Sequence, residues 1–248
     1  CVVGAADTAA AIHGIGLVTG SGFTAVGSGP QTVSVIADPV LTSEEGTHLF
    51  ALAGDPAGGW YRIGAVQNAG IALTRALAWL GTTPADANGA LAGGVRTNDP
   101  IFVPYLAGER TPIVAPDSCG AWLGLSLSTD REAMIRSVVE GVAHAVVLGM
   151  NAVEAAGARL PDPLPLLGGG STDTRFRQLM ADIAQRRILP TTEPDAAVIG
   201  AALLALRVSR EDPIVSLDSV VEPNTDVGDL LATRSATIVD HLSCAVRA

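Results

Sequence analysis

The chain has 248 residues, a net charge of −10 and a hydrophobic content of 48%. A chain of this length can bury a sizeable core, as one large domain or two small ones. The acidic balance argues against nucleic acid as a partner, because phosphate backbones require clustered Lys and Arg. Every basic residue is Arg, so the Lys of a Walker-type phosphate loop is missing. No run of about 18 uninterrupted apolar residues occurs, and we expect no membrane span.

The cysteine pattern predicts a reduced, cytoplasmic protein. Cys1, Cys119 and Cys244 are far apart and odd in number, and no Cys/His cluster has the spacing of a metal site. No signal peptide is visible. Because the chain opens on Cys1 without a Met, in what reads as the middle of an element, we expect it to be a fragment or an excised domain of a longer protein.

The first part of the chain, after an opening loop, predicts antiparallel strands. Runs of β-branched and apolar residues are separated by Gly, Pro, Asp and Ser, as in strands joined by turns. These runs are 23–26, 32–36, 48–53 and 60–66. The period then changes, because apolar residues in 68–80 recur at mostly helical spacing and stop before Gly81. Residues 82–99 predict a small helix with loops.

The second part predicts alternating helices and strands. A short strand at 101–104 leads into a loop, and the longest helical pattern, 130–156, has Thr129 or Asp130 as its N-cap. The remaining expected elements are a strand at 164–167, a helix at 172–184, a strand at 188–189, a helix at 196–207 and a final helix at roughly 227–246. This order predicts an α/β fold with a mixed sheet flanked by helices. It is also the order of the ribonuclease-H-like unit of actin-type ATPases.

Residues 104–112, PYLAGERTP, form the most distinctive stretch. They read as a loop with an ion-pair-capable Glu109 and Arg110, a flexible Gly108 and a rigid Pro112. A structured loop whose charges pair with neighbours explains these residues without a ligand.

Several segments, taken in order, carry a resemblance to a known family. The stretch 104–112 closely resembles the PYLxGERTP segment of xylulose kinases in the FGGY carbohydrate kinase family. Further segments resemble that family's other motifs, in the family's order, at 120–125, 136–141, 166–170, 176–182 and 199–202. Each match alone is weak, but together they cover about residues 1–207. The resemblance implies that 1–248 is the C-terminal nucleotide-binding domain, with the ribonuclease-H-like fold of actin-like ATPases. The N-terminal sugar-binding domain is then absent from this chain.

Asp7 is the candidate catalytic base. Read alone, an Asp in an Ala-rich turn is more often a helix N-cap. The segment 4–10, GAADTAA, resembles the family's GGGDNAA segment. In the family, this Asp accepts the proton of a sugar hydroxyl during phosphoryl transfer. Two departures bear on this role: Ala5 and Ala6 replace two glycines, and Thr8 replaces the usual Asn or Gln.

Two candidate nucleotide contacts lie in the first part of the chain. The turn 27–30, GSGP, stands where the family has a GTSG phosphate turn. Gly27 and Ser28 keep the glycine and the hydroxyl, but Pro30 removes a backbone donor. Read alone, the segment is a hairpin turn. Gly70 belongs to a helix start that resembles the family's NAG segment, where a helix N-terminus suits an anion or a ribose.

A third candidate contact follows the strand at 164–167. Glycines between a buried strand and a helix permit close approach to a base or a ribose, although tight strand-to-helix turns use them too. In the family this turn packs on adenosine. The resemblance therefore implies ATP binding by Gly169, Gly170 and Ser171, and by Thr174 one helical turn further on.

The resemblance implies an ATP-dependent sugar kinase that uses Mg²⁺ to bridge the ATP phosphates. Its first expected substrate is D-xylulose, phosphorylated on the terminal hydroxyl; gluconate and other sugars or polyols are alternatives. Two other classes stay open: a catalytically degraded binding or regulatory module, and an actin-like or chaperone-like ATPase. The expected partners are ATP, a small sugar and the N-terminal half, with a homodimer left open. We expect the isolated chain to bind nucleotide weakly and to lack kinase activity.

Overall fold

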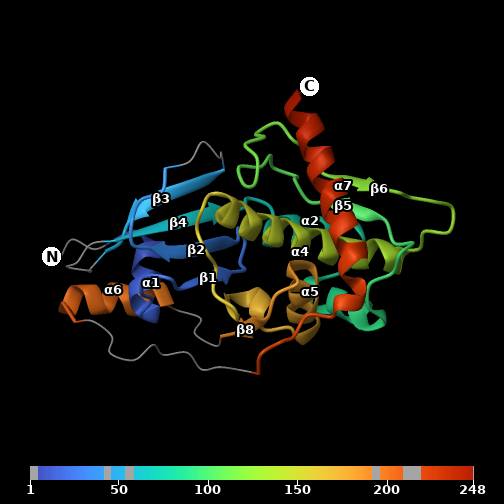
Figure 1. Cartoon of the computed structure of the whole chain (residues 1–248). Helices are drawn as coiled ribbons and strands as arrows, with labels where there is room; N and C mark the ends of the chain where they lie inside the picture. The colour runs from blue at the N-terminus through green and yellow to red at the C-terminus, as the bar shows by residue number, and fades with distance from the viewer. Residues whose placement is uncertain (1–4, 42–45, 54–58, 192–195, 209–218, 248) are drawn as a thin grey trace.

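A six-stranded mixed sheet forms the centre of the protein (Figure 1). The computed structural model describes residues 5–41, 46–53, 59–191, 196–208 and 219–247. The strands of the sheet, in spatial order, are β3 (Thr47–Ala51), β4 (Trp60–Ala65), β2 (Gln31–Ile36), β1 (Gly22–Ala25), β7 (Leu164–Leu167) and β8 (Ile188–Pro190). The first four strands pair with one another in antiparallel fashion, whereas β7 is parallel to β1 and β8 is parallel to β7. The predicted mixed sheet is confirmed.

Helices cover both faces of the sheet. They are α1 (Asp7–Ile15), α2 (Gly70–Trp79), α3 (Pro84–Ala87), α4 (Arg131–Ala155), α5 (Thr174–Ala184), α6 (Ala196–Leu206) and α7 (Gly228–Arg247), with short 3₁₀ turns η1 (Asn88–Gly93), η2 (Gly169–Ser171) and η3 (Thr225–Val227). Most of them match the predicted ranges. Two elements were not predicted. Helix α1 lies within the expected opening loop, and β6 (Ala121–Leu123) pairs with β5 (Ile101–Val103) in a separate two-stranded sheet.

Helix α4 packs closely on one face of the sheet because that face carries small residues. A Cβ atom on Gly64 of β4 would lie 3.0 Å from the carbonyl oxygen of Gly149 in α4. Thr24 and Thr32 share a buried hydrogen bond of 3.0 Å on neighbouring strands. Asp130 caps the start of α4 by accepting from the Ala133 N–H at 2.7 Å, as one of the two predicted N-caps.

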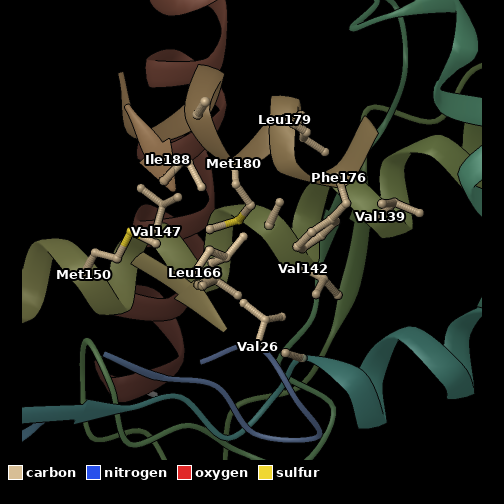
Figure 2. Close-up of a cluster of buried hydrophobic side chains, with 14 of the residues drawn as sticks. Val26, Val139, Val142, Val147, Met150, Leu166, Phe176, Leu179, Met180 and Ile188 are labelled. Carbon is tan, nitrogen blue, oxygen red and sulfur yellow. The ribbon is translucent and has the colours of Figure 1, made fainter. Parts of the chain in front are cut away.

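The largest buried cluster lies between α4, α5 and the parallel strands. Figure 2 shows Phe176, Leu179 and Met180 of α5 pointing toward the valines of α4. Helix α4 is long and apolar enough to cross a membrane, but 94% of its most apolar window is buried inside the protein. The apolar composition of α4 is therefore explained by its burial in the protein core, where its side chains contact other side chains and not water.

Buried ion pairs attach α7 to α4. Arg136 donates to both carboxylate oxygens of Asp99, at 2.7 and 2.8 Å, and this hydrogen bonding raises the pKa of Arg136. One turn later Glu140 accepts from Arg234 of α7. A Cβ atom on the adjacent Gly141 would lie 2.1 Å from the carbonyl oxygen of Phe102. The segment 136–141 thus has a packing and charge-pairing role in this domain.

Helices α1 and α6 lie side by side on the other face of the sheet (Figure 1). Their main chains touch at two glycines. A Cβ atom on Gly200 would lie 1.7 Å from the carbonyl oxygen of Ala10, and one on Gly14 would lie 2.1 Å from that of Ala196. Below them, α1 contributes Ile12 and Ile15 to a cluster with residues of β1, β2 and β4.

The glycine contact between α1 and α6 is directly testable. We predict that Gly200→Ala destabilises the domain by about 1–3 kcal/mol, because the added methyl group overlaps with backbone that cannot rotate away. Urea denaturation monitored by circular dichroism measures the change. Gly89→Ala is the matched control, since a Cβ atom there meets nothing within 4 Å. Equal stability of the two variants would contradict the prediction.

Candidate functional site

Three chain segments meet at one edge of the sheet. The turn 27–30 joins β1 to β2, residues 66–69 follow β4, and residues 168–171 follow β7. Because β1, β4 and β7 run in the same direction, the residues that follow their carboxyl ends lie at the same edge. Such an edge is where open α/β sheets bind ligands.

A cavity of about 370 Å³ opens between the turn 27–30, the segment 168–171 and helices α2, α4 and α5. Five of the seven residues predicted to bind ATP line it: Gly27, Ser28, Gly70, Gly169 and Gly170. The volume lies in the range of small-molecule sites. Its apolar wall consists of Val26, Leu73, Val139, Val142 and Phe176. Figure 2 shows Val26, Val142 and Phe176 converging from three different elements.

The other two predicted contacts lie beside the cavity. Ser171 is buried, and its hydroxyl donates to the carbonyl oxygens of Gly168 at 2.7 Å and Thr191 at 3.3 Å. It therefore stabilises the turn. Thr174 is the exposed first residue of α5. In their stead, the neighbouring Thr172 and Asp173 line the cavity, and the sequence motif did not single these two out.

Glycines bring the walls of the cavity together. The N–H of Gly70 donates to the carbonyl oxygen of Gly27 at 3.2 Å, and a Cβ atom on Gly70 would lie 2.8 Å from that oxygen. On the other side, the N–H of Gly170 donates to the Val26 carbonyl at 3.1 Å. Gly168 has φ +85°, a conformation that favours glycine. Main-chain hydrogen bonds therefore fix the segment 26–27, where the turn 27–30 begins, from both sides.

The turn 27–29 presents unused donors. Within the described residues, the N–H groups of Gly27, Ser28 and Gly29 donate to no other atom, and the Ser28 hydroxyl has no partner. Successive free N–H groups in a turn form a concavity that suits an anion. Pro30 has no N–H, but its carbonyl accepts from Val66 at 3.0 Å and so continues the β2–β4 ladder.

Asp7 begins α1 at the same edge of the sheet, with an exposed side chain. The Thr8 hydroxyl donates to the Gln31 side-chain oxygen at 2.8 Å, and Gln31 directly follows the turn 27–30. Burial, and secondly the negative charge of Asp7, raises the pKa of Tyr61 on β4. In α1, Asp7 is the first helical residue, and the N-cap position is occupied by Ala6.

The main-chain N–H groups just before α2 already bind an anion, the carboxylate of Glu109, and the sequence did not predict this contact. The carboxylate of Glu109 accepts from the N–H groups of Gln67 at 2.7 Å and Asn68 at 3.3 Å. Arg110 makes no ion pair with Glu109 among the described residues; its Nε donates to the Ala65 carbonyl at 2.9 Å. These N–H groups are therefore not free to bind a ligand, although Gly70 beside them lines the cavity.

Metal-binding side chains do not gather in the described part of the chain. No group of three His, Cys, Asp or Glu residues there is arranged to hold a metal ion. His144 is fully buried, and its Nδ1 lies 2.7 Å from the Ser235 hydroxyl. Cys119 and Cys244 are free and exposed. The chemistry available at the sheet edge is that of carboxylate, hydroxyl and main-chain groups.

Comparison with known proteins assigns the family. Residues 47–209 match the model of the FGGY family of carbohydrate kinases, C-terminal domain. The chain belongs to the FGGY family of carbohydrate kinases. Asp7 and the turn 27–30 lie outside the matched residues. The FGGY match does include the segments 104–112, 120–125 and 136–141, which carry the resemblance.

Individual FGGY relatives agree with this assignment. The chain is 31% identical over 208 residues to xylulose kinase from Escherichia coli K12, covering 82% of the chain and 42% of that protein. It is 29% identical over 241 residues to gluconokinase from Bacillus subtilis, covering 88% and 44%. A crystal structure of a xyloylose kinase from Brucella ovis superposes with a TM-score of 0.82 at 25% identity, covering 94% and 50%. The predicted actin-like ATPase fold is confirmed, and the chain spans about half the length of these relatives.

The buried phenol of the segment 104–112 offers a test of the site's scaffold. Tyr105 is fully buried, its hydroxyl has no hydrogen-bond partner in the described part of the chain, and burial raises its pKa. We predict that Tyr105→Phe keeps or increases stability by up to about 1 kcal/mol, because an unpaired buried hydroxyl is removed. Thermal unfolding measures this. A loss above about 1 kcal/mol would mean that the hydroxyl has a partner.

Proposed function

We propose that this chain is the nucleotide-binding C-terminal half of an ATP-dependent sugar kinase, with Asp7 as the catalytic base. One observation carries the proposal. A cavity bordered by a turn whose three N–H groups donate to none of the described residues lies at the sheet edge where α1 presents Asp7. The Thr8–Gln31 hydrogen bond of 2.8 Å connects the helix of Asp7 to the strand that begins at the turn.

The cavity suits a nucleotide in two parts. Its apolar wall, with Leu73, Val142 and Phe176, accommodates a flat base, because aromatic and aliphatic side chains bury such a surface favourably. The turn 27–29 would receive the phosphates on its free N–H groups. Mg²⁺ is usually held mainly through substrate phosphates and few carboxylates, and it supplies neutralisation of charge on the transferred phosphoryl group.

Asp7 would act on the sugar. An exposed carboxylate at the same edge of the sheet as the cavity would accept the proton of the attacking hydroxyl as the phosphoryl group transfers. The first turn of a helix stabilises its charge, and the N–H of Thr8 donates to Oδ1 at 2.7 Å. The sugar contacts themselves would come from an N-terminal domain, as expected of a chain that spans about half of its relatives.

The substrate we propose first is D-xylulose, phosphorylated to xylulose 5-phosphate. The E. coli relative is a xylulose kinase, and the segment 104–112 is of the xylulose kinase type. Gluconate is the second candidate, since a gluconokinase is similar over 88% of the chain. A substrate panel on the full-length protein, with D-xylulose, gluconate and other sugars and polyols, separates them. ATP consumption with none of them would favour a binding or regulatory module.

Two departures from the family pattern, Thr8 and Pro30, favoured such a module, and both are compatible with the proposed kinase site. Thr8, which replaces an amide residue, makes a hydrogen bond to Gln31. Pro30 removes one donor, but the N–H groups of the turn 27–29 still have no acceptor in the described part of the chain. A cytoplasmic location is supported by Cys119 and Cys244, which are both unpaired and exposed.

The nucleotide cavity is tested by filling it. Gly169 lines the cavity, and a Cβ atom there would meet nothing within 4 Å. We predict that Gly169→Leu weakens MgATP binding by the full-length protein at least about tenfold while stability changes by less than about 0.5 kcal/mol. Calorimetric titration measures the affinity. Gly89→Leu, at an equally open glycine outside the cavity, should bind MgATP normally; unchanged binding by Gly169→Leu would rule out this cavity.

The catalytic base is tested by removing its charge. We predict that Asp7→Asn in the full-length protein lowers kcat for sugar phosphorylation by about 10²–10⁴, because the amide cannot accept the proton. MgATP affinity should stay within about twofold, since Asp7 does not line the cavity. Asp38→Asn, at an exposed surface position, is the control. A full-length Asp7→Asn variant with normal kcat would eliminate Asp7 as the base.

A further inference from the structure

The carboxylate of Glu109 is an unusual buried charge. Glu109 is 2% exposed, and within the described part of the chain its hydrogen bonds come from N–H groups and not from a cation. Oε1 accepts from the N–H groups of Gln67 at 2.7 Å, Arg110 at 2.8 Å and Thr111 at 3.3 Å. Oε2 accepts from the N–H and the side-chain amide of Asn68, at 3.3 and 3.2 Å. Five donors thus compensate a charge that would otherwise be costly to bury.

These donors join two segments that are distant in sequence. The side chain of Asn68 also donates to the Gly108 carbonyl and accepts from the Ala107 N–H at 3.1 Å. Gln67 adds a bond from its side chain to the Ala107 carbonyl at 2.7 Å. Six hydrogen bonds therefore attach residues 67–68 to 107–109, and Glu109 is the charged centre of this contact.

The same two residues lead directly into the cavity. Gly70, two positions after Asn68, contacts the turn through its N–H bond to Gly27, and Ile71 donates to the Ser28 carbonyl at 3.4 Å. Gly70, Leu73 and Thr74 of α2 line the cavity opposite the 168–170 segment. A shift of residues 67–68 would therefore move one wall of the cavity and the turn 27–28 that rests on it.

We propose that Glu109 is a positioning residue for nucleotide binding. Its carboxylate sets the start of α2, and through Gly70 it sets the place of the turn 27–28. Glu109 itself lies outside the cavity lining, so it acts through these segments and does not touch the nucleotide. The identity of the ligand as a nucleotide rests on the proposed function; the positioning of α2 does not.

The test compares two Glu→Gln substitutions at equally buried sites. Glu109→Gln keeps the size of the side chain but turns one acceptor oxygen into a donor, which cannot receive the N–H groups. Glu140→Gln makes the same change in a residue that is 4% exposed, pairs with Arg234 and does not line the cavity. Both variants should lower the Tm of the full-length protein, so loss of stability alone does not distinguish them.

Two measurements do distinguish them. We expect Glu109→Gln to speed hydrogen exchange of the amides of 67–71 at least tenfold relative to Glu140→Gln, and to raise the Kd for MgATP at least tenfold. Equal exchange at 67–71 in the two variants would overturn the positioning role. Faster exchange with an unchanged Kd would overturn its link to binding. If the unmodified protein binds no MgATP, the proposed function fails, and hydrogen exchange still decides whether Glu109 positions α2.

A second variant serves if Glu109→Gln does not fold. Asn68→Ala leaves Glu109 with four main-chain donors and removes the side-chain bonds to Gly108, Glu109 and Ala107. We expect a change in the same direction, with roughly a threefold to tenfold higher Kd for MgATP and faster exchange at 67–71. Asn151→Ala, an exposed position on α4, is its control. Identical values for the two Asn→Ala variants would overturn the proposal.

Discussion

The site depends on main-chain contacts that only glycine permits. Val26 and the turn 27–28 lie between the start of α2 and the segment after β7; Gly70 approaches the backbone of Gly27, and Gly170 donates to the carbonyl of Val26. Main-chain hydrogen bonds of 3.2 Å from Gly70 and 3.1 Å from Gly170 help to fix the relative positions of the three segments. A binding wall made in this way is rigid and leaves the donors of the turn free.

The two distinctive sequence segments have different physical roles. Residues 104–112 act at the sheet edge, where Glu109 and Arg110 bind the main chain of 65–68. Residues 136–141 act elsewhere, because Arg136 and Glu140 form buried pairs that attach α7 and the 99–100 loop to α4. A motif that identifies a family is therefore informative about ligand binding only after its contacts are known.

Much of the fold could be predicted from the sequence, because hydrophobic period and turn residues report local structure. Helix α1 was missed because its nine residues are Ala-rich and include Gly14, so no apolar stripe stands out. Strand β6 was missed because three residues carry too little periodicity. For the site, glycines at 27, 70, 169 and 170 were identified. The burial of Ser171 and the donors around Glu109 depend on long-range contacts that no local pattern encodes.

The pairing of Glu140 with Arg234 also bears on where the domain ends. The family match stops at residue 209, whereas α7, which supplies Arg234, Ile238 and Leu242 to the buried interior, begins at Gly228. A shortened chain that ended with the family match would leave Glu140 as an uncompensated buried charge and expose the apolar surface beneath α7. The cooperative folding unit is thus larger than the segment that the family model matches, because it includes the charge pair and the buried apolar residues of α7.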